Sequence, residues 1–195
     1  MSYHHYHTKA IVLKNSDVSE ASRMYKLYTR ELGLVHARAQ GVRALRSKLR
    51  YNLEELAVVD VSLVRGKEFW RVTGAMFDKN APASSKTPNR FLRARAAALL
   101  AQLVQGEEKN EELFDSVYTA FSFLEQSESE NVSIADMEIA LVLKILSSLG
   151  YLGRPNEFEP IISTPAWSQE MLKGVESVRK RAIYAINYAF SHTQL

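Results

Sequence analysis

A run of basic side chains between residues 38 and 50 has the composition of a site that binds phosphates. It contains five cations and no acidic residue: Arg38, Arg43, Arg46, Lys48 and Arg50. Proteins bind nucleic-acid backbones with positive charges at spaced positions and with neutral hydrogen-bond donors. Ser47 supplies such a donor, and Gly41 allows the chain to turn. The spacing predicts phosphate contacts by the five cations; the alternative is an ordinary solvated helix face.

Aromatic residues in the same half of the chain are candidates for stacking on bases. They are Tyr25, Tyr28, Tyr51, Phe69 and Trp70. A base stacked on an exposed ring contributes about 1–3 kcal/mol, but most aromatic residues of a small β-barrel fill its core. Tyr25 and Tyr28 are three residues apart, so they cannot point to the same face of a regular strand. For each ring, a base contact and a core position both remain open.

A second basic cluster lies near the end of the chain, at Arg179, Lys180 and Arg181. It is a candidate secondary contact, either for DNA that continues from the first site or for an acidic protein tail. The alternative is a solvated face with cations in the latter half of a helix, where the helix dipole favours them.

Other polar residues give no pattern typical of catalysis. His4, His5 and His7 could bind a metal, but we expect a flexible terminal tract there. The acidic pairs at 107–108 and 111–112 are expected to favour the start of a helix. There is no cysteine, which excludes disulfides and thiolate zinc sites and suits a reducing cytosol. We therefore expect no enzyme, no bound metal and no cofactor.

The first half of the chain has the residue patterns of β-strands. Alternation from Leu34 to Gln40 places Val35, Ala37 and Ala39 on one face. Strands are expected at Lys9–Lys14, Arg23–Thr29, Leu34–Gln40, Leu56–Val64 and Phe69–Phe77, with a helix at Arg43–Asn52. Five strands with a helix after the third is the order of an OB-fold β-barrel, which binds oligonucleotides in many proteins. A small mixed sheet is the competing prediction.

The second half has helical spacing throughout. A segment rich in Pro, Ser and Ala, Pro82–Pro88, marks the expected boundary. Four helices are predicted, with inner faces at Phe91, Ala94, Ala98, Leu99 and Leu103; at Leu113, Val117, Phe121 and Leu124; at Ile134–Leu149; and at Met171, Val175, Val178, Ala182, Ile186 and Phe190. The sequence therefore predicts an α+β protein, with a barrel domain at residues 1–80 and an α-helical domain at 81–195.

The charge is divided unevenly between these halves. Residues 1–80 carry 14 Lys and Arg against 8 Asp and Glu, whereas residues 81–195 carry 11 against 14. This asymmetry favours a polyanionic partner for the first half. No apolar run is long enough to span a membrane, and the N-terminus lacks the apolar core of a signal peptide. We therefore expect a cytoplasmic protein with no membrane partner.

Several segments resemble the RecO family of bacterial recombination mediators. They are Ala10-Ile11-Val12-Leu13-Lys14 with Asp17 and Glu20-Ala21-Ser22-Arg23; Leu27-Tyr28-Thr29-Arg30-Glu31-Leu32-Gly33; Ala39-Gln40-Gly41-Val42-Arg43 with Ser47-Lys48-Leu49-Arg50; and Leu56 to Arg71 with its Trp70-Arg71 pair. Together they cover about residues 8–77, in order. Leu149-Gly150-Tyr151 and Arg179 to His192 are similar to later parts of the family.

The resemblance implies an N-terminal OB-fold, a C-terminal helical domain and the activity of the family. RecO proteins bind single- and double-stranded DNA, anneal complementary strands, and act with RecR to load RecA onto DNA that is covered by single-strand-binding protein. They also bind the C-terminal tail of that protein. By resemblance this chain is a nucleoid-associated bacterial repair mediator. Its DNA contacts are then Arg38, Arg43, Arg46, Lys48 and Arg50.

Two features depart from the family pattern, and two other functions stay open. Many relatives hold a four-cysteine zinc site after the Leu-Gly-Tyr element, but residues 150–168 contain no Cys and no His. The chain is also short for the family. The alternatives are an OB-fold protein that binds RNA and a protein–protein scaffold whose helical half carries the function.

Overall fold

The computed structural model describes residues 4–79, 87–126, 132–153 and 156–192. The chain forms two compact units: Met1–Ala81 with Ala97–Phe114, and Pro82–Ala96 with Asp115–Leu195. The predicted boundary at Pro82–Pro88 lies almost entirely outside the described residues, which resume at Thr87. A division into domains of residues 1–80 and 81–195 stays a prediction.

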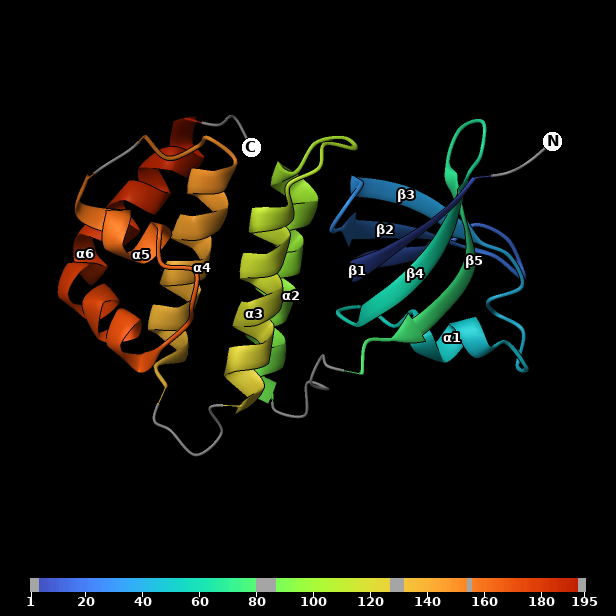
Figure 1. Cartoon of the computed structure of the whole chain (residues 1–195), viewed down its shortest axis with the longest axis horizontal. Coiled ribbons are helices and arrows are strands. Elements are labelled where there is room, and N and C mark those ends of the chain that lie inside the picture. The colour runs from blue at the N-terminus through green and yellow to red at the C-terminus, as the bar shows by residue number, and fades with distance from the viewer. Residues whose placement is uncertain (1–3, 80–86, 127–131, 154–155, 193–195) are drawn as a thin grey trace. The chain divides into compact units, whose positions relative to one another are not determined.

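Five strands form a closed β-barrel in the first unit (Figure 1). They are β1 (His5–Asp17), β2 (Arg23–Thr29), β3 (Gly33–Ala39), β4 (Val58–Arg65) and β5 (Trp70–Phe77). Their order around the barrel is β1-β2-β3-β5-β4; β3 pairs with β5 in parallel, and all other pairs are antiparallel. Helix α1 (Lys48–Asn52) lies between β3 and β4 in sequence. The predicted α+β class with an N-terminal OB-fold barrel and following helices is confirmed.

The barrel core follows from the alternation of each strand. Val35, Ala37 and Ala39 of β3 are fully buried, as their spacing predicted. The other strands contribute aliphatic residues to the same cluster, together with two aromatic rings: Ala10, Val12, Tyr25, Leu27, Val59, Val61, Leu63, Trp70, Val72 and Ala75. The residues between these core positions point outward, so the outer face carries the charged side chains.

Strand β1 begins earlier than the sequence predicted. His5 and His7 pair with Val64 and Ser62 of β4, so the expected flexible tract is wrong for these residues. The Nδ1 of His7 lies 2.9 Å from Oγ of Ser62. The partner strand β4 supplies backbone hydrogen bonds along this length, which a reading of local propensity does not detect.

The predicted helix at Arg43–Asn52 is also too long. Gly41 has φ +66°, and the following residues form turns in which Ala44 N–H donates to Gly41 and Ser47 N–H donates to Ala44. Only the five residues of α1 are helical. Leu45 is 84% exposed, because it lies in the turns before α1, whereas Leu49 of α1 packs against the barrel core.

Residues 97–114 pack against the barrel within the first unit. They comprise the end of α2 (Thr87–Leu103), a connection, and the start of α3 (Glu111–Gln126). Leu34 N–H donates to Gly106 O at 3.1 Å, and the ring of Tyr28 lies 5.7 Å from that of Phe114. This segment therefore covers the part of the barrel surface that contains Tyr28.

In the second unit, α4 (Ile134–Ser148) is the most buried helix, as predicted. Ser133 caps it by accepting a hydrogen bond from Asp136 N–H, and Gly150 follows it with φ +77°. A 3-10 helix η1 (Asn156–Phe158) and α5 (Glu159–Ile162) follow α4 in sequence. Lys144 of α4 donates to the carbonyls of Ile162 and Thr164. The last helix, α6 (Gln169–His192), buries Met171, Val175, Ala182 and Ile186 of its predicted face.

The predicted inner face of α2 is wrong at three of its five positions. Phe91 is 64% exposed, and Ala94 and Ala98 are exposed as well, whereas Leu99 is half-buried and Leu103 is buried. The other buried side chains described on α2 are Asn89, Leu92, Arg93, Ala96, Ala97 and Leu100. The helix is rotated from the expected face because Arg93 is inside, where it meets Glu125 of α3.

Candidate nucleic-acid interface

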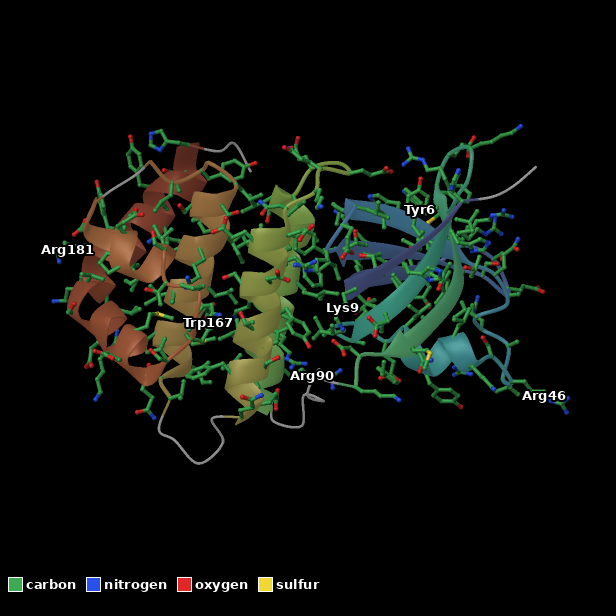
Figure 2. The ribbon with its side chains drawn as sticks, viewed as in Figure 1. Tyr6, Lys9, Arg46, Arg90, Trp167 and Arg181 are labelled. Atoms are coloured by element: carbon green, nitrogen blue, oxygen red, sulfur yellow. The ribbon has the colours of Figure 1, made fainter. Side chains whose placement is uncertain are left out.

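The loop before α1 and α1 itself carry exposed cations. Arg46, Lys48 and Arg50 are all exposed, and none forms an ion pair within the described part of the chain. Figure 2 shows Arg46 pointing away from the barrel into solvent. The α1 helix is held against the barrel, since Asn52 donates a 2.7 Å hydrogen bond from its side chain to Ala75 O of β5. The three cations therefore form a surface that a phosphate backbone can reach.

Arg43 has a different environment from these three residues. Its guanidinium donates to Ser19 O at 2.9 Å and lies 3.4 Å from the carboxylate of Asp17. Asp17 also accepts a 2.7 Å hydrogen bond from Arg23, which holds the pKa of Asp17 below its ordinary value. Arg43 thus fastens the basic segment to the β1–β2 loop, and part of its charge is already compensated.

Arg38 lies on β3, apart from the loop, on the outer face of the barrel. It pairs across the sheet with Arg71 of β5. Both line a cavity of about 220 Å³ together with His5, Gln40, Val64, Val72 and Thr73. Arg71 was not among the predicted DNA contacts. The signal was its position beside Trp70, because alternation around a buried tryptophan places the next residue outside.

Three of the five candidate stacking residues are buried. Tyr25 and Tyr28 have no exposed surface, and Trp70 is 3% exposed, so these rings are core residues. Burial raises the pKa of the Tyr25 hydroxyl. Phe69 is half-buried. Tyr51 of α1 is 61% exposed and follows Arg50 directly, which makes it the aromatic residue best placed to meet a base.

Trp70 has a structural role that involves an acidic residue. Its indole N–H donates to Glu107 at 2.9 Å, and Arg65 also pairs with Glu107. The guanidinium of Arg65 lies 4.9 Å from the Trp70 ring centre, and Tyr6 meets the same ring edge-on at 5.1 Å. Glu107 therefore anchors β5, a function that its position before a helix did not indicate.

The second basic cluster lies on α6. Arg179 donates two hydrogen bonds to Asp136 of α4, at 2.8 and 2.7 Å, and Asp136 is buried. Arg181 is exposed and lies 3.0 Å from Glu157. Lys180 is exposed, with no ion pair among the residues that the structure describes. A secondary contact with DNA or with an acidic tail by this cluster stays a prediction. Within it, Arg179 mainly joins α6 to α4.

No group of three or more His, Asp or Glu side chains within the described ranges is arranged to hold a metal ion. Among the same residues, no helix combines the length and the apolar character needed to cross a membrane.

Comparison with known proteins shows what this chain is similar to. Residues 1–77 match the family model described as Recombination protein O N terminal. The chain is 30% identical over 149 residues to the DNA repair protein RecO of Rubrobacter xylanophilus, covering 76% of this chain and 59% of that protein. It is 28% identical over 146 residues to that of Caldanaerobacter subterraneus subsp. tengcongensis, covering 74% and 58%, and 30% over 176 residues to that of Heliobacterium modesticaldum, covering 85% and 62%. The chain thus spans about three fifths of the length of these curated relatives.

Proposed function

We propose that this chain belongs to the RecO family and is a DNA-binding protein of recombinational repair. The observation that carries the proposal is the group of exposed cations beside the barrel, Arg46, Lys48 and Arg50, which have no carboxylate partner among the described residues. Cations without partners are costly for the free protein to keep together, because like charges repel. A phosphate backbone removes that repulsion when it binds.

The proposed action is to hold strands by their phosphates and leave their bases accessible. Phosphate contacts fix a strand in position but carry no sequence information. Two complementary strands repel each other through their own phosphates, and bound cations reduce that repulsion. Strand annealing then follows from base pairing, without any bond-making step by the protein. Arg38 and Arg43 complete the proposed surface, Arg43 mainly by fixing the loop.

The finer role is proposed from the family. It includes binding of both single- and double-stranded DNA, and loading of RecA, together with RecR, onto DNA coated with single-strand-binding protein. The C-terminal tail of that protein is a further proposed partner, with Lys180 and Arg181 as candidate contacts for an acidic segment. A mediator of this kind works in the bacterial cytoplasm, at the nucleoid, without catalysis of its own.

The test is strand binding and annealing by a variant that lacks the three cations. We expect R46Q/K48Q/R50Q to bind a labelled polythymidine strand about tenfold or more weakly at low salt. The slope of log affinity against log salt should become less negative by about 2, since each phosphate contact contributes about 0.7. Annealing of complementary strands should slow in parallel. The residues are exposed, so the fold should survive, which circular dichroism checks.

A matched control removes three exposed lysines elsewhere in the first unit, as K14Q/K67Q/K79Q. This variant has the same net charge as R46Q/K48Q/R50Q and should keep most of the affinity. If both variants lose affinity equally, the binding depends on net charge and not on this surface. Undiminished binding and annealing by folded R46Q/K48Q/R50Q would refute the proposal. Preference for RNA over DNA of one sequence would favour an RNA-binding protein instead.

A further inference from the structure

The outer face of the barrel carries a row of residues that runs across four strands. His5 of β1 pairs with Val64 of β4, and Val64 pairs with Arg71 of β5. Arg71 in turn pairs with Arg38 of β3. These residues share one face because their neighbours Ala37, Ala39, Trp70 and Val72 point into the core. The row therefore brings two guanidinium groups and an imidazole, distant in sequence, to one place.

A cavity of about 220 Å³ opens along this row. Parallel pairing between β3 and β5 is limited to Ala37 with Trp70 and Arg38 with Arg71, and beyond these pairs the two strands separate. The residues that line the cavity are His5, Arg38, Gln40, Val64, Arg71, Val72 and Thr73. Cavities for complete small molecules measure about 300–1,000 Å³. This one is smaller and suits a single charged group.

The described residues that line the cavity include two arginines and no acidic residue. The two arginines occupy adjacent positions on paired strands. Like charges in adjacent cross-strand positions destabilise a sheet. The Nε of Arg38 is buried and has no hydrogen-bond partner among the described residues. A buried donor without a partner costs about 1–3 kcal/mol. An anion in the cavity would satisfy this donor and separate the two positive charges.

The chemistry of the lining selects the kind of anion. The planar fork of an arginine matches the oxygens of a phosphate, with two parallel hydrogen bonds. The Gln40 side-chain amide is a neutral donor at the same rim. None of the lining residues that the structure describes is aromatic, so none of them can stack on a base. The lining thus fits the backbone of a polynucleotide and leaves its bases outside.

We infer that this cavity binds one backbone phosphate of a single strand, between Arg38 and Arg71 with His5 at its rim. The inference rests on the proposed function, because it names a further contact of the same DNA-binding protein. Gln40, which lines the cavity, comes just before the basic loop in the sequence. A DNA strand bound here therefore has a second contact with the protein, on the β-strands of the barrel and not on α1.

The experiment compares R38Q/R71Q and R71Q alone in the complete 195-residue chain. Arg71 is exposed, so R71Q tests the cavity even if R38Q impairs folding. Anisotropy of a labelled polythymidine strand is measured at several salt concentrations. For R38Q/R71Q we expect about tenfold weaker binding and a salt slope less negative by about 0.7, the contribution of one phosphate. The control K14Q/K79Q removes two exposed cations of the same unit and should change neither quantity in this way.

The outcomes separate this inference from the proposed function. If R71Q and R38Q/R71Q bind like the native chain while R46Q/K48Q/R50Q binds weakly, the cavity is not a strand site and the function stands. If the native chain does not bind the strand, both fall. Titrations with inorganic phosphate and with an oligo-aspartate peptide complete the set. Suppose that R71Q no longer binds phosphate, or no longer binds the oligo-aspartate peptide, but still binds the DNA strand. The cavity would then be a site for a free anion or for an acidic peptide, and the inference would be overturned.

Discussion

Gly33 is the residue whose conformation most clearly depends on its neighbours. It begins β3 with φ +67°, a region that side chains other than glycine rarely adopt. A Cβ atom at this position would also meet the backbone of Glu108. The Glu31-Leu32-Gly33 turn therefore serves two purposes: it connects β2 to β3, and it leaves space for the segment that covers the barrel.

We expect G33A to lower the free energy of unfolding by about 2–4 kcal/mol, from backbone strain and from overpacking. G41A is the matched control, because Gly41 has nearly the same φ, +66°, and nothing within 4 Å of an added Cβ. G41A should lower the free energy of unfolding only by the backbone strain, about 1–2 kcal/mol. Urea unfolding followed by circular dichroism measures both. Equal losses in the two variants would show that the contact with Glu108 is unimportant.

Among the helices, α2 and α3 are joined by a buried ion pair. The side chains of Arg93 and Glu125 are 4% and 5% exposed, and their charged atoms are 3.6 Å apart. The Arg93 guanidinium also lies 4.9 Å from the centre of the Phe121 ring. Burial lowers the pKa of Arg93, and the charge of Glu125 opposes that shift. The pair fixes which face of α2 turns inward, at the cost of two desolvated charges.

Removing one partner should be costly, and replacing both should not. We expect E125A to destabilise the protein by about 3 kcal/mol, because it leaves the Arg93 charge buried without its carboxylate. The double variant R93M/E125M fills the space with apolar side chains and should be close to the native stability. Thermal unfolding of the two variants gives the comparison. The idea fails if E125A is as stable as the native chain.

Considered as a whole, the chain forms two units, and neither is a single continuous stretch of the sequence. The first unit contains the barrel and residues 97–114, although these residues belong to helices that continue in the second unit. Arg30 reaches Glu111 at 3.0 Å, and the Tyr28 hydroxyl donates to Asn110 O at 3.4 Å. The barrel thus uses a later segment of the chain to bury its own Tyr28.

A fragment of residues 1–80 should therefore be less stable than the barrel in longer chains. Exposure of a large buried side chain costs about 1.5–3 kcal/mol, and the fragment leaves Tyr28 without Phe114. We expect a fragment of residues 1–114 to recover most of that loss. Urea unfolding of both fragments, followed by far-ultraviolet circular dichroism, provides the measurement. Equal midpoints would mean that residues 1–80 form an independent domain.

Much of the fold could be predicted from patterns that are local in the sequence. Alternation identified the β3 core residues Val35, Ala37 and Ala39, and a 3.6-residue period identified the inner faces of α3, α4 and α6. The strand order with a helix after β3 is that of an OB-fold barrel, although by itself it left a small mixed sheet open. These signals are readable because each element must bury one face, whatever its partner is. The exposed cations Arg46, Lys48 and Arg50 were also found from a local pattern, because their run contains no acidic residue.

The partners of individual charged side chains could not be read from the sequence. Asp17 binds Arg43 across 26 positions of the chain, Glu107 binds Trp70 across 37, and Arg38 meets Arg71 only through strand pairing. Composition alone described Arg43 as a free cation and Trp70 as a candidate for stacking, and it gave no sign that Arg93 is buried. The contacts of each depend on how distant elements pair and pack, and that packing is a property of the folded chain and not of its local segments.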